Sequence, residues 1–318
     1  MAEFCAILGD QIGYIAPYWI VGILIGSAIS VFAKAKIGRL VEKRQKTGSS
    51  FFGLVTASFL GILSPICLFG TIPIAASLSQ KGVKDDFLSA FMMGSILLNP
   101  QLLIYTSALG YNVAVIRFLV CLAGGVLFGL LARFISREGR FYDFSDINGK
   151  QRDRDTHPNM LARYVFNIGR NIRATGLHFL AGVLLAALFL YLVPDTFAHD
   201  FVSHHQQAQV PLMTLAGLPF YVCGGGAIPL LAGWMQLGLS TGAAMAFTVS
   251  GSATKITNLS AIKTVLGVKK LAVYISFVCF WALVSGTVIN LLPEDCARFD
   301  PPGGEFHMNH QTGHHYGK

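Results

Sequence analysis

The chain has 318 residues, of which 53% are hydrophobic and 13% are charged, and its mean hydropathy is +0.57. Soluble domains carry about 25% charged residues, so this composition excludes an ordinary soluble protein and predicts an integral membrane protein. The net charge of +8 comes mainly from two basic segments, 34–46 and 133–173, which lie beside hydrophobic runs. Because such segments are typical of cytoplasmic loops, we favour this interpretation over a nucleic-acid surface.

Four hydrophobic runs are long enough to cross a hydrocarbon core of about 30 Å, which takes roughly 17 to 25 helical residues. They are Pro17 to Ala33, Val113 to Phe134, Leu177 to Val193 and Leu271 to Leu292. No Lys or Arg precedes the first run, so it lacks the pattern of a cleavable signal peptide. We expect it to stay in place as a membrane anchor.

A segment between the first two runs, Cys67 to Ser95, occurs a second time as Cys223 to Gly251. The two copies align without a gap at a constant offset of 156 residues (67 to 223, 73 to 229) and share nine identical positions. Unrelated apolar segments of this length would share roughly two or three. Each copy is a hydrophobic segment interrupted by Gly and Pro, and such a pair points to a secondary transporter and to its binding site.

The charge distribution predicts that the two halves are inverted. If both basic segments are cytoplasmic, the first half starts outside and ends inside, while the second starts inside and ends outside. We therefore expect an all-α polytopic membrane protein with two inverted-topology repeats, each having three spans and one re-entrant hairpin. The hairpins would be Phe51 to Gln80 and Pro211 to Leu237, both with broken helices. Eight full spans are the alternative.

The expected organisation has four parts. Residues 1–134 form the first membrane repeat, 135–175 a partly helical cytoplasmic linker, 176–293 the second repeat, and 294–318 an external His-rich tail. Both termini would be outside the inner membrane. A disulfide between Cys5 and Cys296 stays open, because spacing cannot pair them.

The second hairpin tip has the sharpest motif, Cys223-Gly224-Gly225-Gly226-Ala-Ile-Pro229. Glycines let the backbone approach a ligand, and Pro229 fits the first turn of a following helix, whose free N–H groups would face the tip. The first tip keeps Cys67, Gly70 and Pro73. The cysteines could hold a soft metal or metalloid through sulfur or could be small buried hydrophobes, and the glycines could instead serve close helix packing.

A second interruption follows each copy, at Asn99-Pro100 and at residues 250–258. At the same offset Asn99 aligns with Lys255, an expected intramembrane charge and therefore a functional candidate, unless its side chain snorkels to the surface. Thr254 and Asn258 offer polar contacts to a solute or satisfy the broken backbone.

Carboxylates are missing from the expected site. Between residues 51 and 132 they are limited to Asp85 and Asp86, and between 174 and 292 to Asp195 and Asp200, all expected in loops. A hard-cation site or a carboxylate proton relay is therefore not expected, whereas a soft, anionic or weakly polar solute fits.

HExxH and paired intramembrane aspartates are also absent from the sequence, which speaks against a membrane protease, and we expect neither an enzyme nor a cofactor. The C-terminal tail contains four histidines that could bind a transition metal, namely His307, His310, His314 and His315. The alternative is that this tail is a cloning remnant.

The segment from Cys223 to Gly267 and, more weakly, the segment from Cys67 to Pro100 resemble the two core motifs of a bacterial permease family. That family includes organoarsenical efflux permeases and proteins proposed to export copper or zinc. The likeness covers both halves but neither the Arg-rich loop nor the tail. It implies export of a metalloid or metal-related solute across the inner membrane. This chain has Phe69 where many first motifs of that family carry a second Cys.

These observations predict an inner-membrane permease that works by alternating access, with a small solute and the lipid bilayer as its partners and no nucleic acid. An anion permease, for example for a sulfur oxyanion, and a non-transporting subunit of a larger complex are the alternatives, and homo-oligomer formation stays open. The expected substrate-binding residues are Cys67, Gly70, Pro73, Asn99, Cys223, Gly224, Gly225, Gly226, Pro229, Thr254, Lys255 and Asn258.

Overall fold

A computed structural model describes residues 51–64, 68–80, 82–136, 141–144, 159–170, 208–218, 224–236 and 238–293, with scattered residues between 9 and 31 and between 172 and 184. The central parts of both hairpin turns, including Cys67 and Cys223, lie outside the described residues. The same holds for Cys5, for Cys296, for the His-rich tail and for most of the expected spans at 17–33 and 177–193.

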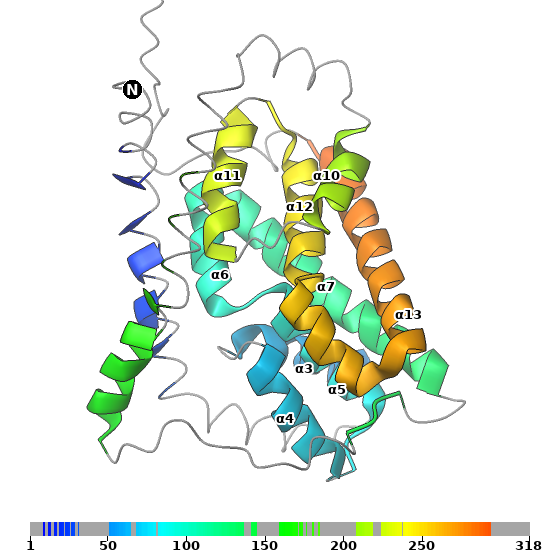
Figure 1. Cartoon of the computed structure of the whole chain (residues 1–318). Helices are drawn as coiled ribbons and strands as arrows, with labels where there is room; N and C mark the ends of the chain where they lie inside the picture. The colour runs from blue at the N-terminus through cyan, green and yellow to red at the C-terminus, as the bar shows by residue number, and fades with distance from the viewer. Residues whose placement is uncertain are drawn as a thin grey trace, which may run out of the picture.

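Every secondary-structure element within the described ranges is helical, as the sequence predicts (Figure 1). The first half contains α3 (Phe51–Leu63), α4 (Leu68–Gln80), α5 (Asp85–Leu97), α6 (Pro100–Thr106), the short 3-10 helix η3 (Ser107–Leu109) and α7 (Tyr111–Ile135). The second half contains α10 (Gln209–Gly217), α11 (Gly224–Gln236), α12 (Thr241–Ala253) and α13 (Ile256–Asn290). In the expected linker, residues 160–170 are helical.

The helix bounds repeat at the offset found in the sequence. Adding 156 to the bounds of α4 and α5 gives those of α11 and α12, and adding it to the first residue of α6 gives the first residue of α13. Gly82 (φ 84°) and Gly238 (φ 99°) take equivalent positions in the turns that follow α4 and α11. Positive φ strains residues that have a Cβ, so glycine is favoured at both places.

Another pair of glycines divides the next helices in both halves. Gly110 (φ 123°) separates η3 from α7, and Gly267 (φ 70°) is a non-helical residue inside α13. The long helix α13 therefore consists of a first part, which corresponds to α6 and η3, and a second part, which corresponds to α7.

Close helix packing holds each half together. In the first half α5 packs against both α3 and α7, and in the second half α12 packs against both α10 and α13. A Cβ on Gly61 would lie 2.2 Å from the Phe91 carbonyl oxygen, and one on Gly242 would lie 2.1 Å from the Gly286 carbonyl oxygen. Small residues at such crossings let membrane helices associate through direct backbone contact.

We expect Gly94→Ala to destabilise the protein by about 1 to 3 kcal/mol, the usual cost of overpacking. The new methyl group would lie 2.5 Å from the Ser58 carbonyl oxygen, a backbone atom of helix α3, which packs against α5. Gly251→Ala is the matched control, because its methyl group would lie at an ordinary 3.4 Å from the Gly217 carbonyl oxygen. Thermal unfolding of the purified protein in detergent measures both variants, and equal stability of the two would contradict the packing.

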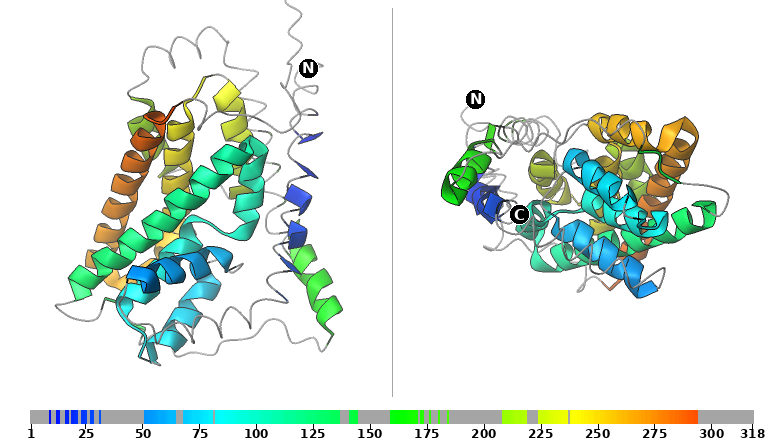
Figure 2. Two further views of the ribbon diagram at one scale, coloured as in Figure 1. Left: turned by 180° about the vertical axis from the view of Figure 1, so that it is seen from behind. Right: turned by 90° about the horizontal axis from the view of Figure 1, so that it is seen from below.

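The two halves meet through their broken segments. The helix α4 contacts α13, α11 contacts α6, and α5 contacts α12, so each hairpin helix packs on the interrupted span of the other half. Both side views place α4 at one end of the bundle and α11 at the opposite end (Figures 1 and 2).

Long apolar helices make this a membrane protein. Tyr111–Ile135 and Asn258–Asn290 are each long and apolar enough to cross a bilayer, and the pair Asp85–Leu97 and Pro100–Leu109, bent by 41°, is a further candidate as one broken span. Large apolar side chains on these two long helices are exposed, including Leu119, Leu127 and Phe280. Lipid contact explains why such residues can stay outside the core.

Candidate functional site

The interruptions after α5 and α12 place Asn99 and Lys255 at equivalent positions. Each is the N-cap of the helix that follows its break. The Asn99 Oδ1 accepts a hydrogen bond from the Leu102 N–H at 2.8 Å, and Pro100 occupies the first helical position. Lys255 is half-buried, and because its ammonium group only donates hydrogen bonds, it cannot cap the free N–H groups at the start of α13.

At the second break, other polar side chains donate hydrogen bonds to backbone carbonyl groups near the end of α12. The Thr254 hydroxyl donates to the Ser250 carbonyl (2.8 Å) and the Asn258 amide donates to the Ser252 carbonyl (3.0 Å). The hydroxyl of the fully buried Tyr274 donates to the Ala253 carbonyl (2.9 Å), a contact that the sequence analysis did not anticipate. The backbone-satisfying interpretation of Thr254 and Asn258 therefore has direct support.

The hairpin helices begin earlier than the sequence analysis expected. Because α11 starts at Gly224, the three glycines form its first turn and Pro229 is its sixth residue, so the expected place of Pro229 in the first turn is wrong. In α4, which starts at Leu68, Gly70 is likewise the third residue and Pro73 the sixth. Placing a glycine in a helix costs about 1 kcal/mol relative to alanine. Leaving backbone N–H and C=O groups without hydrogen-bond partners inside a bilayer costs more, so the helical conformation is favoured. Pro229 cannot donate to the Gly225 carbonyl four residues earlier, so a break in hydrogen bonding persists within the helix.

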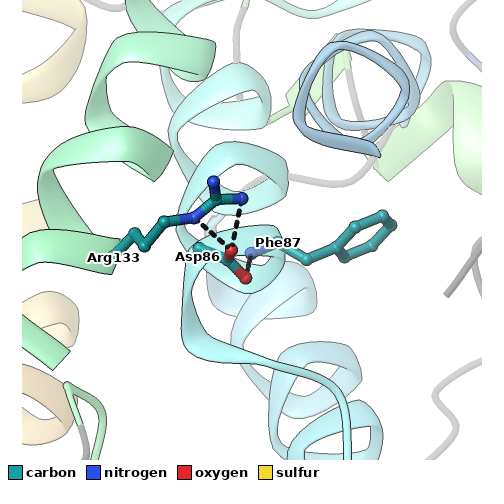
Figure 3. A network of polar contacts seen from close by, with 3 residues as sticks. All are labelled: Asp86, Phe87 and Arg133. Carbon is teal, nitrogen blue, oxygen red and sulfur yellow. Dashed lines mark hydrogen bonds and ion pairs between the residues drawn. The ribbon is translucent and has the colours of Figure 1, made fainter. Parts of the chain in front are cut away.

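The acidic pair is also placed differently from expectation. Asp85 and Asp86 begin α5 rather than lying in a loop, because carboxylates are favourable in the first turn of a helix. Asp86 is only 5% exposed, and its carboxylate accepts hydrogen bonds from the Arg133 guanidinium (2.9 Å) and from the Phe87 N–H (2.7 Å) (Figure 3). The ion pair between Asp86 and Arg133 thereby ties the start of α5 to the end of α7.

Residues 141–144, which we call the docking segment, bind at this same end of the bundle. The Phe141 N–H donates to the Asp85 carboxylate (2.6 Å), and the Ser89 hydroxyl donates to the Tyr142 hydroxyl (2.9 Å). From the second half, the Lys270 ammonium donates to the Phe141 carbonyl (2.8 Å).

The docking segment also joins α13 through its backbone, since the Asp143 N–H donates to the Val265 carbonyl (2.9 Å). Phe141, Tyr142 and Phe144 are buried, and burial raises the pKa of the Tyr142 hydroxyl well above its ordinary value, so this group stays protonated. The docking segment therefore fastens the two halves together at one end.

A buried arginine was missed by the sequence analysis. Arg117 lies in α7 and is 3% exposed, and its Nη1 donates to the Thr106 hydroxyl at 2.6 Å. The Thr106 hydroxyl in turn donates to the Leu102 carbonyl (2.7 Å), whereas the Arg117 Nε has no hydrogen-bond partner. The signal was available, because Arg117 is the one Lys, Arg, Asp or Glu between residues 113 and 132.

The structure brings the two halves of the expected site together at the level of helices. Asn99, Thr254, Lys255 and Asn258 lie within the described ranges, and α11 contacts α6 while α4 contacts α13, the helices that follow the two breaks. Within the described ranges no group of three or more His, Cys, Asp or Glu residues could hold a metal ion. Cys121 and Cys279 lie in α7 and α13, and Cys121 is fully buried and interacts with the Arg117 side chain.

Known bacterial proteins are similar in sequence to this chain. The chain is 24% identical to UPF0718 protein YraQ of Escherichia coli (strain K12) over 263 residues, which is 81% of this chain and 73% of that protein. It is 30% identical to UPF0718 protein YcgR of Bacillus subtilis (strain 168) over 91 residues, 28% of this chain and 29% of that protein. No solved structure matches it. Residues 1–291 match the ArsP_1 family, whose description is predicted permease, and the chain therefore belongs to this family of membrane transport proteins.

Proposed function

We propose that the chain is an inner-membrane permease that moves a small solute by alternating access. Its two halves would be inverted-topology repeats, and its solute would bind where the hairpin tips and the two helix breaks converge near the midplane. The proposed site comprises the two Cys, the tip glycines and prolines, Asn99 and Lys255.

One observation carries this proposal. Each hairpin helix contacts the interrupted span of the opposite half, α4 on α13 and α11 on α6, and the helix bounds recur at one offset. Irregular backbone at membrane depth is tolerated where it lines a protein or water-filled interior, and paired breaks of this kind are where secondary transporters bind solutes. The positions of α4 and α11 at opposite ends of the bundle support the inversion.

The first candidate solute is a metalloid, a soft metal or a related small molecule that is exported. Thiols at Cys67 and Cys223 would engage soft atoms, and the helix starts would stabilise polarised groups. Membership in a permease family and the resemblance of both core motifs to organoarsenical efflux permeases support this candidate.

An anion, such as a sulfur oxyanion, is the second candidate. The Lys255 ammonium is half-buried beside a helix break, whereas the carboxylates of Asp85 and Asp86 bond to Phe141 and Arg133 at the end of the bundle. A cationic group beside a proposed solute site favours a negative solute.

We also propose that the docking segment is the inner gate of this permease. Alternating access requires that the path to one side closes while the other opens. The docking segment bonds to α5 of the first half and to α13 of the second half, so its release would free both broken spans at the end proposed to be cytoplasmic.

Flux measurements with the purified chain in lipid vesicles test the proposal. Thiosulfate, zinc, copper and an organoarsenical are offered in parallel, with wild type, Cys223→Ser and empty vesicles. Export of a metalloid or metal that falls at least about tenfold in Cys223→Ser, the scale of one lost metal-ligand interaction, supports the first candidate. Thiosulfate flux that persists in Cys223→Ser supports the anion. No flux of any solute would favour a subunit that transports nothing on its own.

A further inference from the structure

The Arg117 guanidinium carries a charge that the described protein does not neutralise. The described ion pair on the same helix, Arg133 with Asp86, is 16 residues further along α7 (117 to 133), or about 24 Å at the helical rise. Asp85 precedes Asp86 in the first turn of α5 and is equally remote along the bundle. Within the described ranges Arg117 has no carboxylate partner.

Protein groups compensate only part of the cost of burying this charge. Taking an ion out of water is costly even after the surroundings relax. The Thr106 hydroxyl and the Cys121 thiol, which interact with the guanidinium, are neutral groups, and the carbonyl end of the short helix α6 adds only a partial negative charge. The Nε is buried and has no hydrogen-bond acceptor among the described residues, which adds to the cost. A guanidinium so arranged has donor capacity for an additional anionic oxygen.

Arg117 also borders the proposed solute site. Its hydrogen-bond partner Thr106 ends α6, the half-helix that begins beside Asn99. Both α6 and η3 contact α11, whose first turn is the glycine motif. A shift of α11 against α6 during alternating access would therefore act directly on the surroundings of this cation.

We propose that Arg117 is the counter-charge for a transported oxyanion, bound through the guanidinium edge that carries Nε. The planar guanidinium suits such oxyanions because it can donate two parallel hydrogen bonds to two oxygens. This inference rests on the proposed permease function and selects its anion candidate. Thr106 then acts as a positioning residue that holds the guanidinium through Nη1.

Equilibrium binding to the purified full chain in lipid nanodiscs tests the assignment without relying on flux. Thiosulfate and sulfate are titrated at constant ionic strength, with chloride as the balancing anion, and binding is read from thermal stabilisation and calorimetry. Wild type should bind an oxyanion saturably. Arg117→Gln should weaken binding at least tenfold, and Arg117→Lys, which keeps the charge but loses the planar fork, at least threefold.

Lys269→Gln is the matched control, because it removes one positive charge from an exposed position of α13 and should bind like wild type. If Arg117→Gln does not fold, Arg117→Lys decides the matter. Binding by the folded Arg117 variants equal to that of wild type, or no saturable oxyanion binding at all, overturns the assignment. Arg117-dependent binding without flux would keep Arg117 as an oxyanion-binding residue but would refute transport, whereas metalloid flux without oxyanion binding would support the permease and overturn the role of Arg117.

Discussion

Lys255→Met should reduce solute flux about 30-fold or more while leaving the protein folded. Removing one partner of a buried charged contact costs about 2 to 5 kcal/mol, and 1.4 kcal/mol corresponds to a factor of ten. The folded state should tolerate the change, because Met keeps most of the apolar length of the half-buried Lys255 side chain. Initial flux into proteoliposomes, together with thermal unfolding in detergent, measures the two effects separately.

Lys263→Met is the control for this experiment. Lys263 lies on the same helix eight residues later (255 to 263) and is exposed, so the same loss of charge and of side-chain length occurs away from the break. We expect its flux to stay within twofold of wild type. A Lys255 variant that transports as fast as the Lys263 variant would remove Lys255 from the proposed site and would leave the snorkelling interpretation in its place.

Phe141→Ala should open the end of the bundle that the docking segment closes. Its side chain is completely buried, lies edge-on to Phe128 with ring centroids 6.1 Å apart, and has the Lys270 ammonium 5.6 Å from its centroid. Truncating a buried Phe costs about 3 to 5 kcal/mol. That energy holds the docking segment in place, so its loss should raise the open population by about a hundredfold or more.

Chemical labelling measures this opening. The completely buried Ser89, which bonds to Tyr142, is replaced by Cys, and its reaction with a membrane-impermeant maleimide is followed by mass spectrometry. Labelling should be slow with Phe141 present and at least about tenfold faster in Phe141→Ala, in line with the population shift. Phe134→Ala makes the same truncation at an exposed position near the end of α7 and should have no effect. Equal labelling in all three proteins would show that the docking segment does not guard this end.

The sequence analysis predicted the features that depend on local pattern. The breaks at Asn99 and at Lys255 and the hydrophobic runs 113–134 and 271–292 follow from Pro, Gly and apolar residues in the sequence, and the structure confirms both breaks and places the runs in the long helices α7 and α13. The duplication at one offset strengthened these predictions, because each half gave an independent indication of the same interruption.

Features that depend on tertiary packing were predicted wrongly or not at all. Asp85 and Asp86 looked like loop residues because the local pattern does not reveal the partners, Phe141 and Arg133, which lie about 50 residues away. The early starts of α4 and α11 reflect the cost of unpaired backbone, which outweighs the low helix propensity of glycine. The placements of Cys67, Cys223 and the tail histidines stay predictions, since they lie outside the described residues.

The distance between Cys67 and Cys223 in the membrane tests the convergence of the two hairpins most directly. Spin labels on these two residues, with the other four cysteines replaced by serine, would report it in nanodiscs, and impermeant reagents would report the face from which each residue is reached. The proposed architecture predicts that the backbones of the two tips lie about one helix-to-helix spacing apart, 8 to 10 Å, to which the length of the two label side chains is added. It also predicts that the hairpins enter from opposite faces of the membrane. A separation approaching the hydrocarbon thickness of about 30 Å, or entry of both hairpins from one face, would contradict it.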